Sequence, residues 1–225
     1  MIGIFDSGMG GLNVLAELRQ IAPLCDVCFF ADRENAPYGT KSPSELLRLV
    51  RRDVKLLREC GADEILIGCC TASTVYGELS EGERRRVFPI IKPTVKAALT
   101  ATKIGRIGVI ATEATVRSHA FRQEIEREGA VAVEYAAQAL VSLVEGGESD
   151  SYITRTGLKC VRDALSEIKN EKIDALILGC THFPRLSGII SDVMGSVRLI
   201  SSAYEGALEI SRVACTDGVG ATVYL

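Results

Sequence analysis

ILIGCCTAS at residues 65–73 and LILGCTHF at residues 176–183 share one pattern. Each is an apolar run closed by Gly-Cys, with a threonine one or two positions later. A short apolar run without polar alternation is typical of a strand that is buried on both faces of a parallel sheet. We therefore expect Cys69 and Cys180 to stand at the ends of two buried strands. Only the second copy carries a histidine, His182.

Other apolar runs alternate with helical patterns on both sides of these two stretches. The expected strands are 2–5, 27–31, 64–68, 107–111, 131–136 and 175–179. The expected helices are 12–21, 43–59, 92–101, 114–128, 151–169 and 203–213. Alternation of this kind predicts an α/β fold with mainly parallel sheets.

The order of these elements also repeats. IGIFDS at 2–7 is echoed by IGVIAT at 107–112, and the Gly-Cys at 68–69 by the Gly-Cys at 179–180. This repetition predicts two pseudo-symmetric α/β domains, one carrying Cys69 and the other Cys180. Because ligands of such sheets bind beyond the carboxyl ends of the strands, we expect the active site in the cleft between the domains.

Composition narrows the class of protein. The chain has 225 residues, of which 47% are hydrophobic and 24% charged, and its formal net charge is -3. These values are typical of a globular protein and do not indicate nucleic-acid binding, so we interpret Arg84, Arg85 and Arg86 as a solvated helix face. No stretch reaches the ~18 apolar residues of a membrane span, and the N-terminus enters a strand directly. We expect a cytoplasmic protein.

The eight cysteines predict thiols rather than a disulfide framework, because no secretory signal is evident. Cys25 and Cys28 form a CxxC pair, but no second pair stands at zinc spacing, so we expect no metal. Away from the two strand ends, we interpret the cysteines as small core or surface residues: Cys25, Cys28, Cys60, Cys160 and Cys215.

Two opposed thiols suit the inversion of a carbon stereocentre. One thiolate removes a proton from one face of the carbon, and one thiol supplies a proton to the other face. A helix is expected to begin after each cysteine, and its N-terminus would lower the thiol pKa and bind a substrate carboxylate. No lysine stands in a comparable setting to anchor pyridoxal phosphate, so we expect no cofactor.

The chain resembles the glutamate racemases of the cofactor-independent aspartate/glutamate racemase superfamily. The motifs that carry the resemblance run in the family's order over most of the chain: IGIFDSGMGGLNV at 2–14, FADRENAPYGTKS at 30–42, GCCTAS at 68–73, VIATEATVRS at 109–118, LVSLVEGG at 140–147 and LGCTHFP at 178–184.

The resemblance implies interconversion of L- and D-glutamate, which supplies D-glutamate for peptidoglycan synthesis, in a homodimer that needs no cofactor. It also implies that the C-terminal segment returns to the first domain. We therefore expect a first domain of 1–94 plus 204–225 and a second of 95–203.

The resemblance also assigns roles to individual residues. Cys69 and Cys180 would be the catalytic acid/bases, one for each enantiomer, with Asp6 assisting on the first side and His182 and Glu145 on the second. The residues implied to bind substrate are Ser7, Pro37, Tyr38, Gly39, Cys70, Thr71 and Thr181.

Several of these residues have simpler interpretations. Asp6 could cap the following helix, and Glu145 could be a helix-end charge. Tyr38 beside Pro and Gly is first a turn residue, and a lone histidine such as His182 is usually structural. We interpret His119, on an otherwise ordinary helix, as structural.

Other classes of protein remain open from the sequence. The glycine-rich turn after the first strand, with Asp32 at the end of the next, resembles a dinucleotide site, but the third fingerprint glycine is absent. A cysteine hydrolase could use Cys180, His182 and Glu145, although the duplicate Cys69 would then be unexplained. A catalytically inactive amino-acid-binding protein is a further alternative.

Three departures from the family pattern bear on the substrate. Cys70 stands where the family usually has Asn, Ser201 where Asp is frequent, and Ala137-Gln138 where Cys-Pro is usual. Aspartate or another acidic amino acid is therefore the alternative substrate to glutamate.

Overall fold

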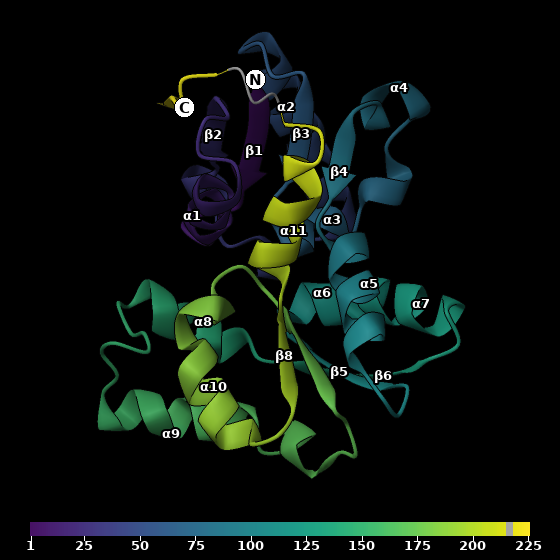
Figure 1. Ribbon diagram of the computed structural model, residues 1–225, viewed down its shortest axis with the longest axis vertical. Coiled ribbons are helices and arrows are strands. Elements are labelled where there is room, and N and C mark those ends of the chain that lie inside the picture. The colour runs from purple at the N-terminus through teal and green to yellow at the C-terminus, as the bar shows by residue number, and fades with distance from the viewer. Residues whose placement is uncertain (215–217) are drawn as a thin grey trace.

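The computed structural model describes residues 1–214 and 218–225, which contain two parallel sheets (Figure 1). The first contains β1 (Ile2–Asp6), β2 (Val27–Ala31), β3 (Glu64–Ile67), β4 (Val87–Pro89) and β9 (Thr222–Tyr224), in the order β4-β3-β1-β2-β9. The second contains β5 (Arg106–Ala111), β6 (Val131–Ala136), β7 (Ala175–Gly179) and β8 (Arg198–Ser201), in the order β6-β5-β7-β8. The predicted α/β class with two parallel sheets is confirmed.

Helices connect and cover the strands. The α-helices are α1 (Gly11–Ile21), α2 (Pro43–Glu59), α3 (Cys70–Ser73), α4 (Glu81–Arg84), α5 (Ile91–Ala101), α6 (Glu113–Ser118), α7 (Ala120–Arg127), α8 (Gln138–Glu145), α9 (Arg155–Ala164), α10 (Ser187–Met194) and α11 (Ser202–Ser211). Short 3-10 turns are η1 (Arg33–Asn35), η2 (Tyr38–Thr40), η3 (Tyr76–Glu78), η4 (Ile168–Asn170) and η5 (Phe183–Leu186). Local sequence explains the start of α2, where Ser42 and Glu45 form a capping box and Pro43 takes the first helical position.

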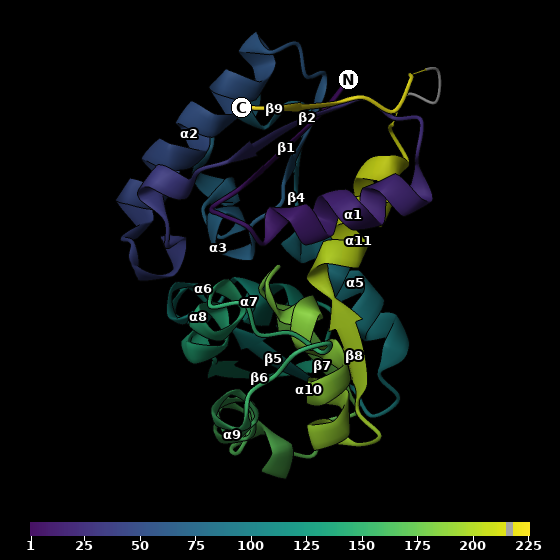
Figure 2. The same ribbon diagram turned by 90° about the vertical axis from the view of Figure 1, so that its left-hand side faces the viewer.

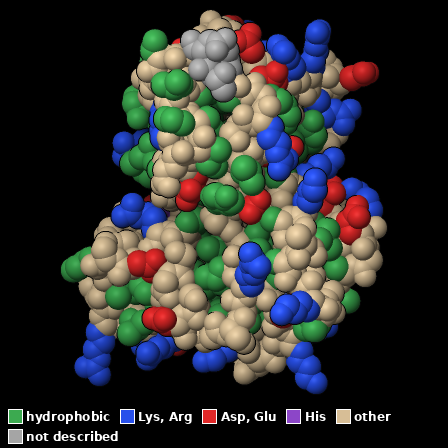
Figure 3. All heavy atoms as spheres, viewed as in Figure 1, with side chains coloured by type: hydrophobic (Ala, Val, Ile, Leu, Met, Phe, Trp, Pro, Cys, Tyr) green, Lys and Arg blue, Asp and Glu red, His purple; other side chains and the backbone are tan. Residues whose placement is uncertain are grey.

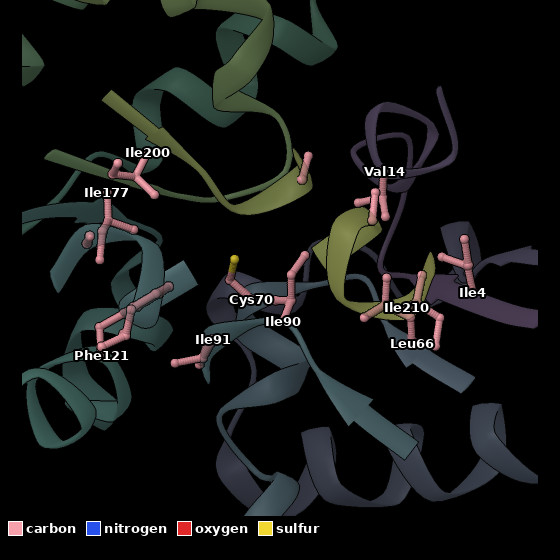
Figure 4. Packing of buried hydrophobic residues seen from close by; sticks show 14 of the residues in the cluster. Ile4, Val14, Leu66, Cys70, Ile90, Ile91, Phe121, Ile177, Ile200 and Ile210 are labelled. Carbon is pink, nitrogen blue, oxygen red and sulfur yellow. The ribbon is translucent and has the colours of Figure 1, made fainter. Parts of the chain in front are cut away.

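The hydrophobic core has three parts. One lies between the first sheet and α2, and another lies between the second sheet and helices α8, α9 and α10. The third joins the sheets through α1, α5 and α11, and Figure 2 shows α1 and α11 side by side. Figure 4 shows this shared core, in which Ile4 and Leu66 of the first sheet and Ile177 and Ile200 of the second belong to one cluster. The two sheets are therefore held at a common interface.

Two predicted helices differ from those observed. The expected helix 114–128 is divided into α6 and α7, because His119 takes a left-handed conformation with φ of 54°. The expected helix 151–169 begins only at Arg155, after the N-cap Thr154, and its α-helical part ends at Ala164. The short strands β4, β8 and β9 and the helices α8 and α10 were not predicted, because their runs are brief or of mixed polarity.

Charges of both signs are mixed over the face shown in Figure 3, with hydrophobic side chains between them. Arg84, Arg85 and Arg86 are exposed, as expected, but the predicted helix face is wrong for the last two, because α4 ends at Arg84 and Arg86 takes a left-handed conformation. In the part of the chain that the structure describes, no helix has the length and apolarity needed to cross a bilayer.

Candidate active site

Cys69 and Cys180 both follow an interior strand of a sheet. Cys69 comes two residues after β3 and Cys180 comes directly after β7, and both side chains are buried, with 5% and 7% of their surface exposed. Both line one small cavity between the sheets, with a volume of about 20 Å³. That volume accommodates about one water molecule. The structure thus brings the two predicted strand ends together around a nearly closed site.

The other predicted site residues line the same cavity, apart from Asp6. They are Ser7, Pro37, Tyr38, Gly39, Cys70, Thr71, Glu145, Thr181 and His182. Asp6 lies behind it, fully buried. Its Oδ1 accepts a hydrogen bond from the Gly8 N–H at 2.8 Å, and its Oδ2 accepts one from the Thr181 hydroxyl at 2.9 Å. Asp6 therefore connects the first sheet to the residue that follows Cys180.

Burial governs the pKa values of the acidic groups here. Burial raises the pKa of Asp6, although the His182 charge and the Gly8 and Thr181 hydrogen bonds oppose the shift. Burial also raises the pKa of Cys69 to about 11, and the Asp6 charge adds to this rise. The pKa of Cys180 is raised well above its ordinary value, first by burial and then by neighbouring Cys70. The expected lowering by helix N-termini is wrong for this closed site, because desolvation is the larger effect.

Each thiol has different neighbours. The Cys69 thiol donates to the Ser7 hydroxyl at 3.4 Å and accepts from the Ala72 N–H at 3.5 Å. On the other side, Cys180 Sγ lies 3.5 Å from His182 Nδ1. The second ring nitrogen, Nε2, lies 3.4 Å from Glu145 Oε1 without hydrogen-bond geometry. The predicted association of Cys180, His182 and Glu145 is therefore present as a chain of contacts.

The turn at Pro37-Tyr38-Gly39 is fixed by a buried network behind it. The Tyr38 hydroxyl lies 2.6 Å from Asp32 Oδ2 and 3.0 Å from Asp53 Oδ2. Arg52 pairs with both carboxylates. The Tyr38 hydroxyl is thus bound to carboxylates of its own domain, and Asp32, weighed above as a ribose-binding acid, holds this turn.

Three threonine hydroxyls connect the two sheets beside the cavity. Thr71 shares hydrogen bonds with Thr112 at 2.9 Å and with Thr115 at 3.0 Å, and Thr112 and Thr115 are 2.8 Å apart. All three side chains are buried. A hydroxyl can donate one bond and accept others, so this triad can satisfy itself without water.

Cys70 belongs to the shared core that joins the sheets. Figure 4 shows Cys70 beside Ile90 and Ile91, and Ile177 and Ile200 of the second sheet belong to the same cluster. Burial raises the pKa of Cys70, and its thiol lies beside Ser202. Its neighbour Cys69 belongs instead to the cluster on the α2 side of the first sheet. The two adjacent cysteines therefore belong to different hydrophobic clusters, although both line the cavity.

The remaining histidine and the other cysteines that the structure describes lie outside the site. His119 contacts Glu134 at 2.9 Å where α6 meets α7. Cys25 and Cys28 are buried, and Cys60 and Cys160 are partly exposed. Cys215 lies outside the described residues.

A family model described as Asp/Glu/Hydantoin racemase matches residues 14–209. The chain belongs to this family. Among its relatives, the glutamate racemase of Persephonella marina is 38% identical over 213 residues, covering 94% of this chain and 81% of that protein. The glutamate racemase of Aquifex aeolicus is 37% identical over 220 residues, covering 97% of this chain and 85% of that protein.

Solved structures agree with this assignment. Glutamate racemase isoform RacE1 from Bacillus anthracis superposes with a TM-score of 0.90 at 31% identity, covering 100% of this chain and 86% of that chain. Glutamate racemase from Francisella tularensis, crystallised with D-glutamate, gives a TM-score of 0.88 at 26% identity and covers 99% of this chain and 86% of that chain. Membership of the racemase family favours racemisation over a cysteine hydrolase or a nucleotide-binding protein.

Three polar residues that line or border this cavity were not predicted as site residues. Thr112 and Gln138 line it, and Thr115 completes the hydroxyl triad. Thr112 had a signal in the sequence, because it directly follows β5, the strand that repeats β1, and aligns with Ser7 in that repeat. Gln138 was noted only as part of a departure from the family pattern, and Thr115 had no signal, since the importance of both depends on which residues of the other domain they meet.

Proposed function

We propose that this chain interconverts L- and D-glutamate by two-base proton transfer at the α-carbon, without a cofactor. The observation that carries the proposal is that Cys69 and Cys180, one from each sheet, line the same enclosed cavity. A single-thiol hydrolase has no use for the second cysteine. The related proteins named glutamate racemase support glutamate as the substrate.

In the proposed reaction, the thiolate of one cysteine takes the α-proton and leaves a carbanion that the carboxylate delocalises. The thiol of the other cysteine then gives its proton to the opposite face of the same carbon. The enantiomer is released and the two sulfurs have exchanged protonation states. With a pKa of about 11, Cys69 is almost entirely protonated at neutral pH. The positive α-ammonium group of the substrate would lower that pKa and favour the thiolate.

The supporting residues act through these two thiols. Asp6 would assist proton movement at Cys69, to whose pKa its charge already contributes. His182, 3.5 Å from Cys180 Sγ, would exchange a proton with that thiol, and Glu145 would stabilise the charged imidazole. Because the Asp6 carboxylate also holds Thr181, it couples both sides of the reaction.

Polar groups around the cavity would bind the substrate. Ser7, Thr71 and Thr181 would contact its amino-acid end through hydroxyl and backbone groups. The turn of Pro37, Tyr38 and Gly39 would bind the side-chain carboxylate through its backbone N–H groups, while the Tyr38 hydroxyl holds the turn in place.

Cys70 would contribute its backbone to substrate binding, since its side chain packs in the shared core. The Asn that the family usually has at this position would offer amide donors and an acceptor to the substrate, whereas a thiol offers only one weak donor and a weak acceptor. Glutamate would therefore bind weakly unless another residue replaces the amide contact.

Substrate entry would require the cavity to enlarge. A space of about 20 Å³ is too small for an amino acid. The contacts that close it join the two sheets: Thr71 with Thr112 and Thr115, and Asp6 with Thr181. Opening would therefore separate the domains at these hydroxyls.

Four further proposals concern the whole molecule. We place the domain boundaries at 1–94 plus 204–225 and 95–203, with the pairing of β9 to β2 in support of the C-terminal return. We also propose a homodimer that works in the cytoplasm and supplies D-glutamate for peptidoglycan synthesis. Aspartate is the alternative substrate.

The test of the proposed function is α-proton exchange in D2O. Purified protein is incubated with each enantiomer of glutamate and aspartate, without pyridoxal phosphate, NAD or metal. We expect deuterium at the α-carbon of both enantiomers of glutamate, measured by proton NMR. Exchange with aspartate alone would replace the substrate, and no exchange with either amino acid would overturn racemisation.

A further inference from the structure

Gln138 is the first residue of α8 and lines the cavity next to the turn at Gly39. The approach is close, since a methyl group on Gly39 would lie only 2.7 Å from Gln138 Oε1. Gly39 comes from the first domain and Gln138 from the second. The Gln138 amide therefore faces the backbone that we propose for binding the substrate's side-chain carboxylate.

The Gln138 amide oxygen is buried and has no hydrogen-bond partner among the described residues. A buried acceptor without a partner is costly, so its place in the closed cavity calls for a reason. A side-chain amide carries an acceptor on one side and two N–H donors on the other. Rotation about the terminal torsion exchanges them, so this group can offer either to a ligand above Gly39.

The charge of the cavity lining indicates that the amide N–H donors, and not the oxygen, contact the ligand. Among the described residues that line it there is no lysine or arginine, while Glu145 is present. An acidic amino acid brings a second carboxylate into this space. Neutral hydrogen-bond donors must bind this carboxylate. Among the described lining residues, Gln138 is the one whose side chain carries an NH2 group.

We propose that Gln138 is a specificity-determining residue whose amide N–H donates to the distal carboxylate of the substrate above Gly39. The inference rests on the proposed function for the identity of that substrate as an acidic amino acid. It adds a group from the second domain to the recognition of the side chain. Closure of the two domains would then depend on the substrate's distal carboxylate.

The test compares binding of two ligands of nearly equal size by calorimetry. Racemic glutamate and racemic glutamine are used, so that turnover of either releases no net heat. The main variant is Gln138→Glu, which preserves size but replaces the donor by a negative charge. Glutamate at the first turn of a helix is favourable, so we expect this variant to fold. Gln138→Ala is the second variant, and Gln123→Glu on the exposed face of α7 is the matched control.

We expect Gln138→Glu to weaken glutamate binding by about a hundredfold, because it sets two carboxylates against each other. Glutamine binding should change by less than about threefold, since its amide can donate to the new carboxylate. Gln138→Ala should weaken glutamate binding about tenfold. The control should alter neither Kd. A structural role alone would change both ligands equally.

Equal effects on both ligands, or none, in both Gln138 variants would overturn the inference. The proposed function has a separate readout, α-proton exchange by the wild-type protein. If exchange occurs and the ligand preference does not shift, the function stands and the role of Gln138 is wrong. If glutamate binds without exchange, the function is wrong and the preference still decides the role of Gln138. Absence of binding by either ligand to the wild-type protein would overturn both.

Discussion

Replacing Asp53 by asparagine should remove a pH-dependent loss of stability. Asp53 is on α2 and fully buried, and it contacts the Tyr38 hydroxyl at 3.0 Å and Arg52 Nη2 at 2.6 Å. Burial raises the pKa of this carboxyl from 3.8 to about 6, and the neighbouring Asp32 charge adds to the rise. The Arg52 and Tyr38 contacts oppose the shift without cancelling it.

The sign follows from the direction of this shift. The pKa of Asp53 is higher in the folded than in the unfolded protein, so binding of its proton stabilises the folded protein. This stabilisation is complete below about pH 4 and is lost as the pH rises through about 6. The shift of about two units corresponds to about 3 kcal/mol. Roughly 1.5 kcal/mol of this develops between about pH 5 and about pH 8. The wild-type chain should lose that amount relative to Asp53→Asn, in which position 53 does not titrate.

Urea unfolding at about pH 5 and about pH 8, followed by circular dichroism, measures the difference. Any constant loss from the weakened Arg52 contact cancels when the two pH values are compared. Asp163→Asn, at an exposed ion pair of α9, is the control for removal of a surface carboxylate. The free energy of unfolding of wild type minus that of Asp53→Asn should be larger at about pH 5 than at about pH 8. A value that is the same at both pH values, or larger at about pH 8, would refute the reasoning.

Three other predictions concern the cavity. In Gly10→Ala, the new methyl group would lie 2.3 Å from Thr181 Oγ1 and displace that side chain. We expect kcat for glutamate to fall about a hundredfold, while circular dichroism shows an intact fold. An unchanged kcat would contradict the close contact. Thr71→Val removes the hydroxyl bound to Thr112 at 2.9 Å and should lower the free energy of unfolding in urea by about 1–3 kcal/mol, and an unaltered midpoint would count against the triad. With a pKa of about 11, Cys69 should be alkylated by iodoacetamide about ten times faster for each pH unit from about 7 to 10; peptide mapping by mass spectrometry would reveal a plateau if the thiol were already ionised.

Much of the fold was predictable because the strands are buried on both faces. The runs at Ile2–Asp6, Arg106–Ala111 and Ala175–Gly179 are apolar throughout or nearly so, which leaves a parallel sheet as the natural structure. The turn of α6 into α7 was not predictable, since an apolar periodicity continues past His119 and only the backbone conformation breaks it. The strand β4 contains Pro89 and has three residues, so it carries little signal of its own.

The site was partly predictable for a related reason. The repeated Gly-Cys places both thiols at strand ends, and two such ends in facing sheets meet at a cleft. The surroundings of each thiol depend on contacts between residues far apart in sequence, such as Thr181 with Asp6. Local sequence also led to the wrong direction for the thiol pKa values, because helix starts were visible and the depth of burial was not.

The most direct test of the two-thiol mechanism is the rate of glutamate racemisation in three single variants, measured by circular dichroism at fixed enzyme concentration. Cys69→Ser and Cys180→Ser should each lose racemisation by about a thousandfold or more, because a hydroxyl is a far weaker base than a thiolate. Cys70→Ala removes a thiol that lines the cavity but takes no part in the proposed proton transfer, so it should keep activity within about tenfold of wild type. Full activity in Cys69→Ser, or its loss in Cys70→Ala alone, would contradict the account.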